Sequence, residues 1–164
     1  MQLFEYCVHQ SRYQPLPHAK VMGRIFLHLH GHIKDKALKS LFESYVRRLE
    51  AKHLRVEVTS DKVPTKDYVK ALSSLEGRKY FLDESGASHT SVTFADEIKQ
   101  SSLRTENTHF CIGPVDGWSG TLDENNHTIS LSQMTFTHEF AAVLLVEQIY
   151  RAFEIMRGSE YHRM

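Results

Sequence analysis

The chain has 164 residues, of which 41% are hydrophobic and 24% are charged. That is enough for one α/β core and too few for two ordinary domains. Twenty lysine and arginine residues balance twenty aspartate and glutamate residues, which removes the overall basic charge by which many nucleic-acid-binding proteins are recognised. No segment is long and apolar enough to span a membrane, and the two cysteines, Cys7 and Cys111, lie far apart. We therefore expect a cytoplasmic protein without a disulfide framework.

The first 21 residues form a polar segment with two prolines and scattered aromatic residues, and they lack the pattern of a secretory signal. Two interpretations are open. The segment is either an extension that docks on the domain through its aromatic side chains, or a poorly ordered addition to it. The remaining residues, 22–164, are expected to form a single domain.

Predicted strands and helices alternate along this domain. The predicted elements are a strand at 24–30, a helix at 34–52, a strand at 54–59, a helix at 66–75, a strand at 79–83 followed by a turn through Gly86, a helix at 92–103 and a strand at 110–112. This order indicates an α/β fold with a mostly parallel sheet and helices on both faces. In such sheets, ligand-binding groups collect beyond the carboxyl ends of the strands.

The last third of the chain contains two loops and a long helix. The strand at 110–112 ends at Gly113, in the loop CIGPVDGWSG, and a second apolar run, HTISLSQMTF, ends in a turn that is rich in threonine. From His138 to Met156 the predicted helix is apolar on nearly every face. We expect one face to cover the sheet and another to meet a second subunit, with Leu145 and Ile149 at that interface.

The two loops admit two interpretations. As strand-end loops separated by one short excursion, they could close around a flat heterocycle and bind its edge through backbone groups. A lone glycine loop is more often a simple turn, and the apolar residues of these segments could serve only as core.

Two further features remain open from the residues alone. His28, His30 and His32 lie at alternating spacing, which is compatible with a zinc site but more typical of hydrogen-bonded or surface histidines. The helix at 34–52 carries more basic than acidic residues, so it is either an RNA-facing surface or, more commonly, a solvated amphipathic face.

Several ordered segments together resemble a known family. These segments are LDESGASHTSVTFA (82–95), CIGPVDG (111–117), LSQMTFTHEF (131–140), EQIYRAFEIMRG (147–158) and the terminal EYHRM. They are similar to the SPOUT superfamily of knotted methyltransferases, in particular the ribosomal RNA large subunit methyltransferase H family. The resemblance begins near Met22, which favours the second interpretation of residues 1–21. It implies a homodimer with a C-terminal deep trefoil knot.

The resemblance also implies a reaction and a site. The family methylates N3 of a pseudouridine in large-subunit rRNA, and its cofactor is S-adenosylmethionine. The residues implied to bind the cofactor are Leu82, Gly113, Leu131, Ser132, Gln133, Met134, Thr135 and Phe136. The implied catalytic candidates are His138, Tyr150, Arg151, Tyr161 and His162. In the family, the tail of one subunit approaches the cofactor site of the other.

Two of the catalytic candidates have simpler alternative roles, an ion pair with Glu147 for Arg151 and a solvated chain end for His162. The chain also departs from the family pattern at four positions, which are Pro114, Thr137, Ala142 and Ala87. Pro114 lacks a backbone N–H, and the two alanines lack the basic side chains usual there. A relative that binds RNA or ribosomes with weakened transfer is therefore the main alternative function, and an unrelated nucleotide-binding protein is the third.

Overall fold

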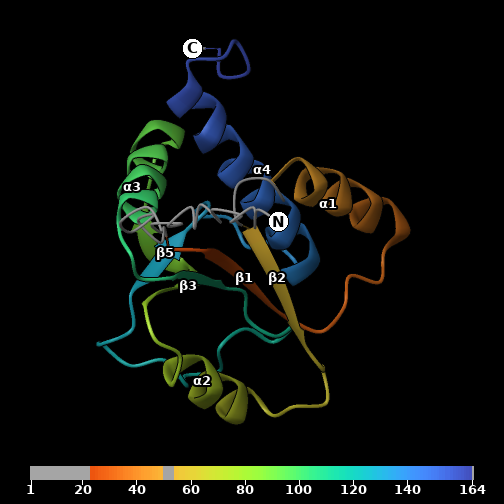
Figure 1. The fold of residues 1–164 in the computed structure, drawn as a ribbon. Coiled ribbons are helices and arrows are strands. Elements are labelled where there is room, and N and C mark those ends of the chain that lie inside the picture. Colours follow the sequence, from red (N-terminus) through yellow and green to blue (C-terminus); the bar gives the residue numbers. More distant parts are fainter. Residues whose placement is uncertain (1–22, 50–53, 164) are drawn as a thin grey trace, which may run out of the picture.

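The computed structural model describes residues 23–49 and 54–163, which alternate between strands and helices (Figure 1). The predicted extension at 1–21 lies outside the described residues. The elements are β1 (Ile25–His30), α1 (Lys36–Leu49), β2 (Leu54–Thr59), α2 (Thr65–Ser73), β3 (Arg78–Ser88), α3 (Ser91–Leu103), β4 (Thr108–Cys111), β5 (Thr128–Ser130) and α4 (His138–Arg157). Nearly all of the predicted elements are present, with ends that differ by a few residues.

The five strands form one sheet in the order β2-β1-β4-β3-β5, and every neighbouring pair is parallel. Leu27 of β1, for example, lies between Val56 of β2 and Phe110 of β4. The inner strand β4 is buried along its whole length, as is typical of a parallel strand covered on both faces. The predicted α/β class with a parallel sheet is confirmed.

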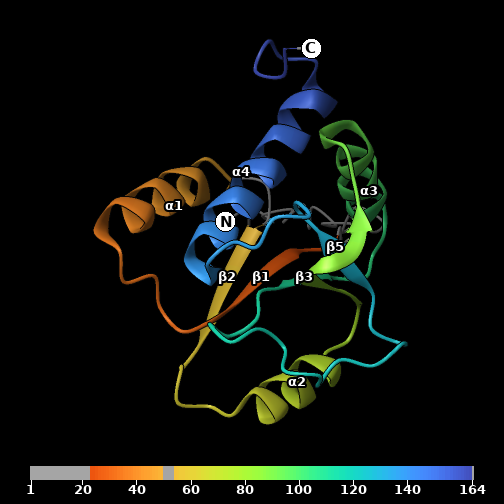
Figure 2. The same ribbon diagram turned by 180° about the vertical axis from the view of Figure 1, so that it is seen from behind.

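Helices cover both faces of the sheet, as the sequence predicts. Figures 1 and 2 show α1, α3 and α4 on one face and α2 on the other. On the first face, Leu27, Leu49 and Ile98 belong to a large apolar core with the inner side of α4. On the second face, a smaller cluster joins Tyr68, Val69, Leu72, Phe81, Cys111 and Trp118. Among the described residues, no helix has the length and apolar character needed to cross a membrane.

The helix α4 lies between α1 and α3 and is covered by both. Leu145 and Ile149 are fully buried in the core of the chain, so their predicted place at a dimer interface is wrong. The helix is apolar around most of its circumference because the sheet and two helices contact it at once. The exposed apolar residues of α4 are Phe140, which is 42% exposed, and Met156, and several others, including Leu144, are half-buried.

Strand β3 is longer than predicted, and the expected turn at Gly86 is a bulge within it. Leu82 and Ala87 both pair with Ile129 of β5, so the residues between them leave the ladder. A Cβ atom at Gly86 would lie 2.7 Å from backbone atoms of Ile129. Glycine at this position therefore allows the strand to rejoin β5 after the bulge. The second apolar run of the last third contributes only three residues, Thr128–Ser130, to the sheet.

Two of the three clustered histidines are held by hydrogen bonds. The His109 Nε2 atom lies 3.0 Å from the Glu76 carbonyl, which can only accept, so His109 Nδ1 accepts from His28 Nε2 at 2.9 Å. Burial, with a smaller contribution from His109, lowers the pKa of His28 to about 4. His30 Nε2 donates to the Val63 carbonyl at 2.7 Å. Within the described parts of the chain, no group of three potential metal ligands is found.

Candidate functional site

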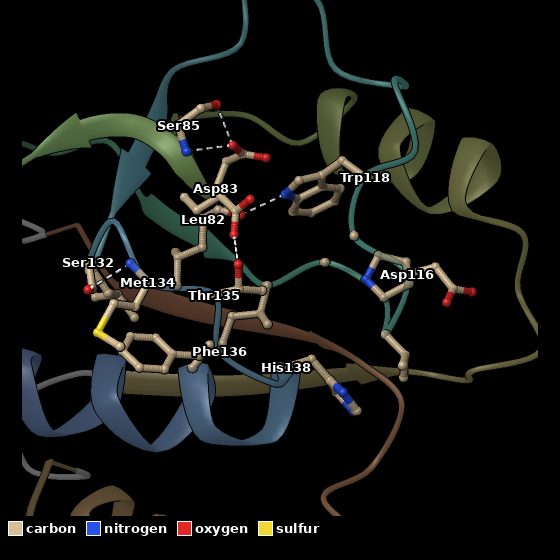
Figure 3. Close-up of a pocket in the computed structure, with 18 residues that line it drawn as sticks. Leu82, Asp83, Ser85, Asp116, Trp118, Ser132, Met134, Thr135, Phe136 and His138 are labelled. Carbon is tan, nitrogen blue, oxygen red and sulfur yellow. Dashed lines mark hydrogen bonds between the residues drawn. The ribbon is translucent and has the colours of Figure 1, made fainter.

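A cavity of about 540 Å³ lies at the carboxyl ends of β3, β4 and β5 (Figure 3). Its walls come from the β3 bulge, the glycine loop after β4, the loop after β5 and the first turn of α4. The lining residues are Leu82, Asp83, Glu84, Ser85, Ile112, Gly113, Pro114, Val115, Asp116, Gly117, Trp118, Leu131, Ser132, Met134, Thr135, Phe136, His138 and Ala141. A cavity of this size and place is typical of ligand sites in parallel sheets.

Trp118 joins two walls of the cavity. Its indole Nε1–H donates to the Leu82 carbonyl at 2.7 Å (Figure 3). A Cβ atom at Gly113 would lie only 3.1 Å from the same ring, so the ring packs directly on the backbone of the glycine loop. The side chain is 5% exposed and stacks on Tyr68 beneath the sheet. Trp118 therefore sets the position of the Leu82 carbonyl relative to Gly113.

The third wall is tied to the β3 bulge by side-chain hydrogen bonds. Thr135 Oγ1 donates to the Glu84 carboxylate across the cavity mouth. Within the loop after β5, Ser132 Oγ accepts from the Met134 N–H at 3.0 Å, and Ser130 Oγ donates to the Ser132 carbonyl at 2.7 Å. Polar side chains thus replace the strand ladder after Ser130 and shape this segment as a wall of the cavity.

The cavity is acidic. Asp83, Glu84 and Asp116 line it, whereas none of its lining residues is lysine or arginine. Asp83 Oδ1 accepts from the Ser85 N–H at 2.9 Å, which holds the carboxylate within the bulge. Such a cavity favours a cationic ligand with an apolar body and disfavours a ligand that carries phosphates.

His138 lies at the start of α4, at the edge of the cavity (Figure 3). The helix begins there because Thr137 Oγ1 accepts from the Phe140 N–H at 3.3 Å. Burial lowers the pKa of His138, and the positive charge of Lys34 adds to this effect, whereas Glu139 opposes it. The neutral imidazole is therefore favoured near pH 7, in a form that can accept a proton.

The other catalytic candidates lie elsewhere in the chain. Tyr161 Oη donates to Glu147 Oε1 at 3.0 Å and lies 3.1 Å from Tyr45 Oη. Arg151 pairs with Glu147 at 2.6 Å, and its guanidinium stacks over the Tyr161 ring. Tyr150 meets the same ring edge-on. These contacts dock the tail on α1 and α4 of its own chain. Only the first turn of α4 lines the cavity, and the helix runs from there toward the C-terminus (Figure 1).

Comparisons with known proteins match this chain over most of its length. The sequence model of a family described as "Predicted SPOUT methyltransferase" matches residues 24–162. A protein of Thermodesulfovibrio yellowstonii named "Ribosomal RNA large subunit methyltransferase H" is 36% identical over 149 residues, which cover 86% of this chain and 99% of the relative. Proteins of the same name from Pseudothermotoga lettingae and Clostridium botulinum (strain Okra / Type B1) are 33% and 36% identical and are covered over 95% of their lengths. The chain belongs to the SPOUT methyltransferase family.

The structure of this SPOUT methyltransferase brings most of the predicted cofactor residues together. Those that line the one cavity are Leu82, Gly113, Leu131, Ser132, Met134, Thr135 and Phe136. Gln133 belongs to the same loop but is exposed and is not a lining residue. Of the catalytic candidates, only His138 lines the cavity. Trp118 was not predicted, because a single tryptophan in a loop carries no sequence signal for a particular carbonyl partner.

The departures from the family pattern differ in their distance from this cavity. Pro114 lines it, whereas Ala142 is fully buried in the core and Ala87 lies outside the lining. The expectation that both alanines remove positive charge at the site is therefore not supported by their positions in this chain. Thr137 caps α4, so that departure has a structural role of its own.

Proposed function

We propose that this SPOUT methyltransferase transfers a methyl group from S-adenosylmethionine to N3 of a pseudouridine in large-subunit rRNA. The cavity carries the proposal, because seven residues that the resemblance implies for cofactor binding converge on it. Relatives named "Ribosomal RNA large subunit methyltransferase H" match the chain over nearly their whole length and support the choice of substrate.

The size, apolar surface and charge of the cavity support the cofactor. Its volume of about 540 Å³ lies in the range of small-molecule sites. Ile112, Leu131 and Phe136 offer apolar surface to a heterocycle, while the acidic lining favours a positive charge. Leu82, Gly113 and the loop at 131–136 would hold the cofactor, whose sulfonium supplies an electrophilic methyl group when bound. A dinucleotide with its phosphates is disfavoured by the same carboxylates.

The protein must align the acceptor nitrogen and remove its proton. Methyl transfer would replace the N3–H bond of the base by an N–CH₃ bond, with the methyl group supplied by the cofactor, so a group of the protein must take the N3 proton. His138 is placed at the cavity edge, and its lowered pKa keeps it ready to accept a proton. His162 is the second candidate for accepting or relaying that proton.

A homodimer would bring His162 to the site. The rise of a helix is about 1.5 Å per residue, so Tyr150 lies roughly 18 Å along α4 from His138. The tail of the same chain is docked in this part of the helix, with Tyr161 on Glu147 and Tyr150, and a partner's tail would have to approach the cavity instead. His162 Nδ1 is buried without a hydrogen-bond partner among the described residues, so its hydrogen-bonding capacity is unused within the single chain. We also propose that the C-terminal segment of this chain forms the family's trefoil knot.

The activity is tested by tritiated methyl transfer to large ribosomal subunits that lack the modification. We expect transfer by the unaltered protein and a loss of about a hundredfold to ten-thousandfold for His138→Ala, because a positioned proton acceptor contributes about that much. The matched control is His127→Ala, an exposed histidine before β5. Equal rates for both variants would remove His138 from the reaction.

The alternative is a relative that binds ribosomes with weakened transfer. Pro114 favours it, because the residue lines the cavity and offers no backbone N–H to a ligand. Calorimetry with S-adenosylmethionine separates the two. Cofactor binding without transfer would support the weakened relative, and Pro114→Gly should then restore activity.

The dimer is tested by sedimentation at micromolar concentration. We expect Leu144→Glu on the outer side of α4 to dissociate the pair while the chain stays folded, because Leu144 is only half-buried in one chain. Leu41→Glu, on the exposed side of α1, is the control. A folded monomer in the unaltered protein would refute the homodimer.

A further inference from the structure

The carboxyl edge of the sheet is divided by charge. The half formed by β3, β4 and β5 holds the acidic cavity. The half formed by β1 and β2 continues into two loops and into the first turns of α1 and α2. In the segments 31–39 and 60–70, six lysines stand against three aspartates. The whole chain is neutral by formal charge, so this is a local excess of positive charge.

Two of these aspartates are already engaged by the protein. Asp35 Oδ1 accepts two backbone N–H groups in the first turn of α1, each at 2.9 Å. Asp61 pairs with Lys34 at 3.2 Å. Several exposed lysines in the same segments have side chains with no ionic or hydrogen-bond partner within the described ranges; among them are Lys36, Lys62 and Lys66.

The cationic loops lie next to the cavity. Glu139 accepts the backbone N–H groups of Lys34 and Asp35 at 3.1 and 3.0 Å, and the preceding residue, His138, lines the cavity. The Gly31 N–H donates to the Thr59 carbonyl at 2.7 Å, which joins the loop after β1 to the loop after β2. A continuous path of contacts therefore leads from the acidic cavity across His138 to the lysines.

We propose that these two loops bind the phosphate backbone of the RNA substrate, through Lys34, Lys62 and Lys66. The inference rests on the proposed function, in which the substrate is rRNA. Lysine contacts to phosphate position a nucleic acid without reading its sequence. The acidic cavity repels phosphates but admits a neutral base, so the division of charge holds the backbone outside while the target base enters beside His138.

The test compares two double variants of equal charge. Lys62→Glu with Lys66→Glu reverses two charges in the proposed surface. Arg55→Glu with Lys99→Glu reverses two exposed charges at the amino end of β2 and on α3. Lys34 is left unaltered because it pairs with Asp61. Binding to large ribosomal subunits that lack the modification is measured from about 50 to 200 mM salt, the range over which phosphate contacts weaken strongly.

We expect the Lys62 and Lys66 pair to bind at least about tenfold more weakly than the control pair. The slope of log K against log salt is negative, and it should become shallower by about 1.5, which corresponds to two lost phosphate contacts. S-adenosylmethionine affinity, measured by calorimetry, should be the same in both variants. Equal weakening would assign the effect to net charge and overturn the proposal, as would unchanged binding or a failure of the unaltered protein to bind.

Failure of the proposed function would look different. If the unaltered protein binds subunits with this salt dependence but transfers no methyl group, the proposed activity fails and the surface stands. If the Lys62 and Lys66 pair methylates subunits with an unchanged KM, the surface fails and the activity stands.

Discussion

Replacing Trp118 by phenylalanine should weaken cofactor binding as well as destabilise the fold. The change keeps an aromatic ring against Gly113 and Tyr68 but removes the indole N–H that donates to the Leu82 carbonyl at 2.7 Å. Leu82 stands at the point where β3 leaves the ladder and the cavity begins. Without its donor, this carbonyl has no fixed direction in the cavity wall.

The magnitude follows from the lost hydrogen bond. A part-buried carbonyl left without a donor destabilises a protein by about 1–3 kcal/mol. For a chain of this size, a loss of about 2 kcal/mol lowers Tm by about 4–8 °C. If the displaced carbonyl removes about 1.4 kcal/mol from the binding free energy, S-adenosylmethionine affinity falls about tenfold.

Calorimetry gives the affinity and thermal unfolding gives Tm. The control is Tyr80→Phe, which removes the hydrogen bond from Tyr80 Oη to Glu97 at 2.9 Å on a side chain that does not line the cavity. The control should lose stability and keep its affinity. If Trp118→Phe also keeps its affinity while losing stability, the side chain serves the fold alone and its role in the site is refuted.

Three further predictions concern the site and the sheet. Gly113→Val should abolish cofactor binding by pushing the Trp118 ring aside, since the new Cβ would lie 3.1 Å from it; retained binding in calorimetry would place the cofactor elsewhere. His28 has a folded pKa of about 4, below its unfolded value near 6.5. The stability that neutral His28 contributes to the folded protein is therefore complete above pH 6.5 and is lost as pH falls toward 4. The free energy of unfolding should fall by about 2 kcal/mol over this range after solvent screening. Urea unfolding across that range should show this loss, and His28→Phe should reduce it. Deleting residues 161–164 should reduce methyl transfer by about a hundredfold or more if the tail completes the partner's site, while cofactor affinity stays constant. Because Tyr161 is hydrogen-bonded to Glu147, a small fall in Tm accompanies the deletion, and an unchanged rate would assign the tail to the fold.

Local patterns in the sequence were sufficient for the sheet and its helices. The apolar run of β1 and the helical spacing in α1 depend only on the period of side chains along one element. The alternation of strands and helices then indicated a parallel sheet, with Leu82 and Gly113 at its carboxyl edge. The resemblance of the C-terminal segments located the cavity residues, although it left Gln133 among them.

Only the tertiary structure decided the contacts between segments that lie far apart in the chain. The sequence predicted Leu145 and Ile149 at a subunit interface, yet α1, α3 and the sheet bury them within one chain. The sequence predicted a turn at Gly86, yet this residue approaches Ile129 closely and belongs to a bulge in β3.

The partners of Trp118 and of the lysines at the β1 edge were likewise hidden in the sequence. A sequence period shows which side of an element is apolar or charged. It does not show which element covers that side, because packing depends on the chain's three-dimensional path, and so the neighbours of each residue had to come from the structure.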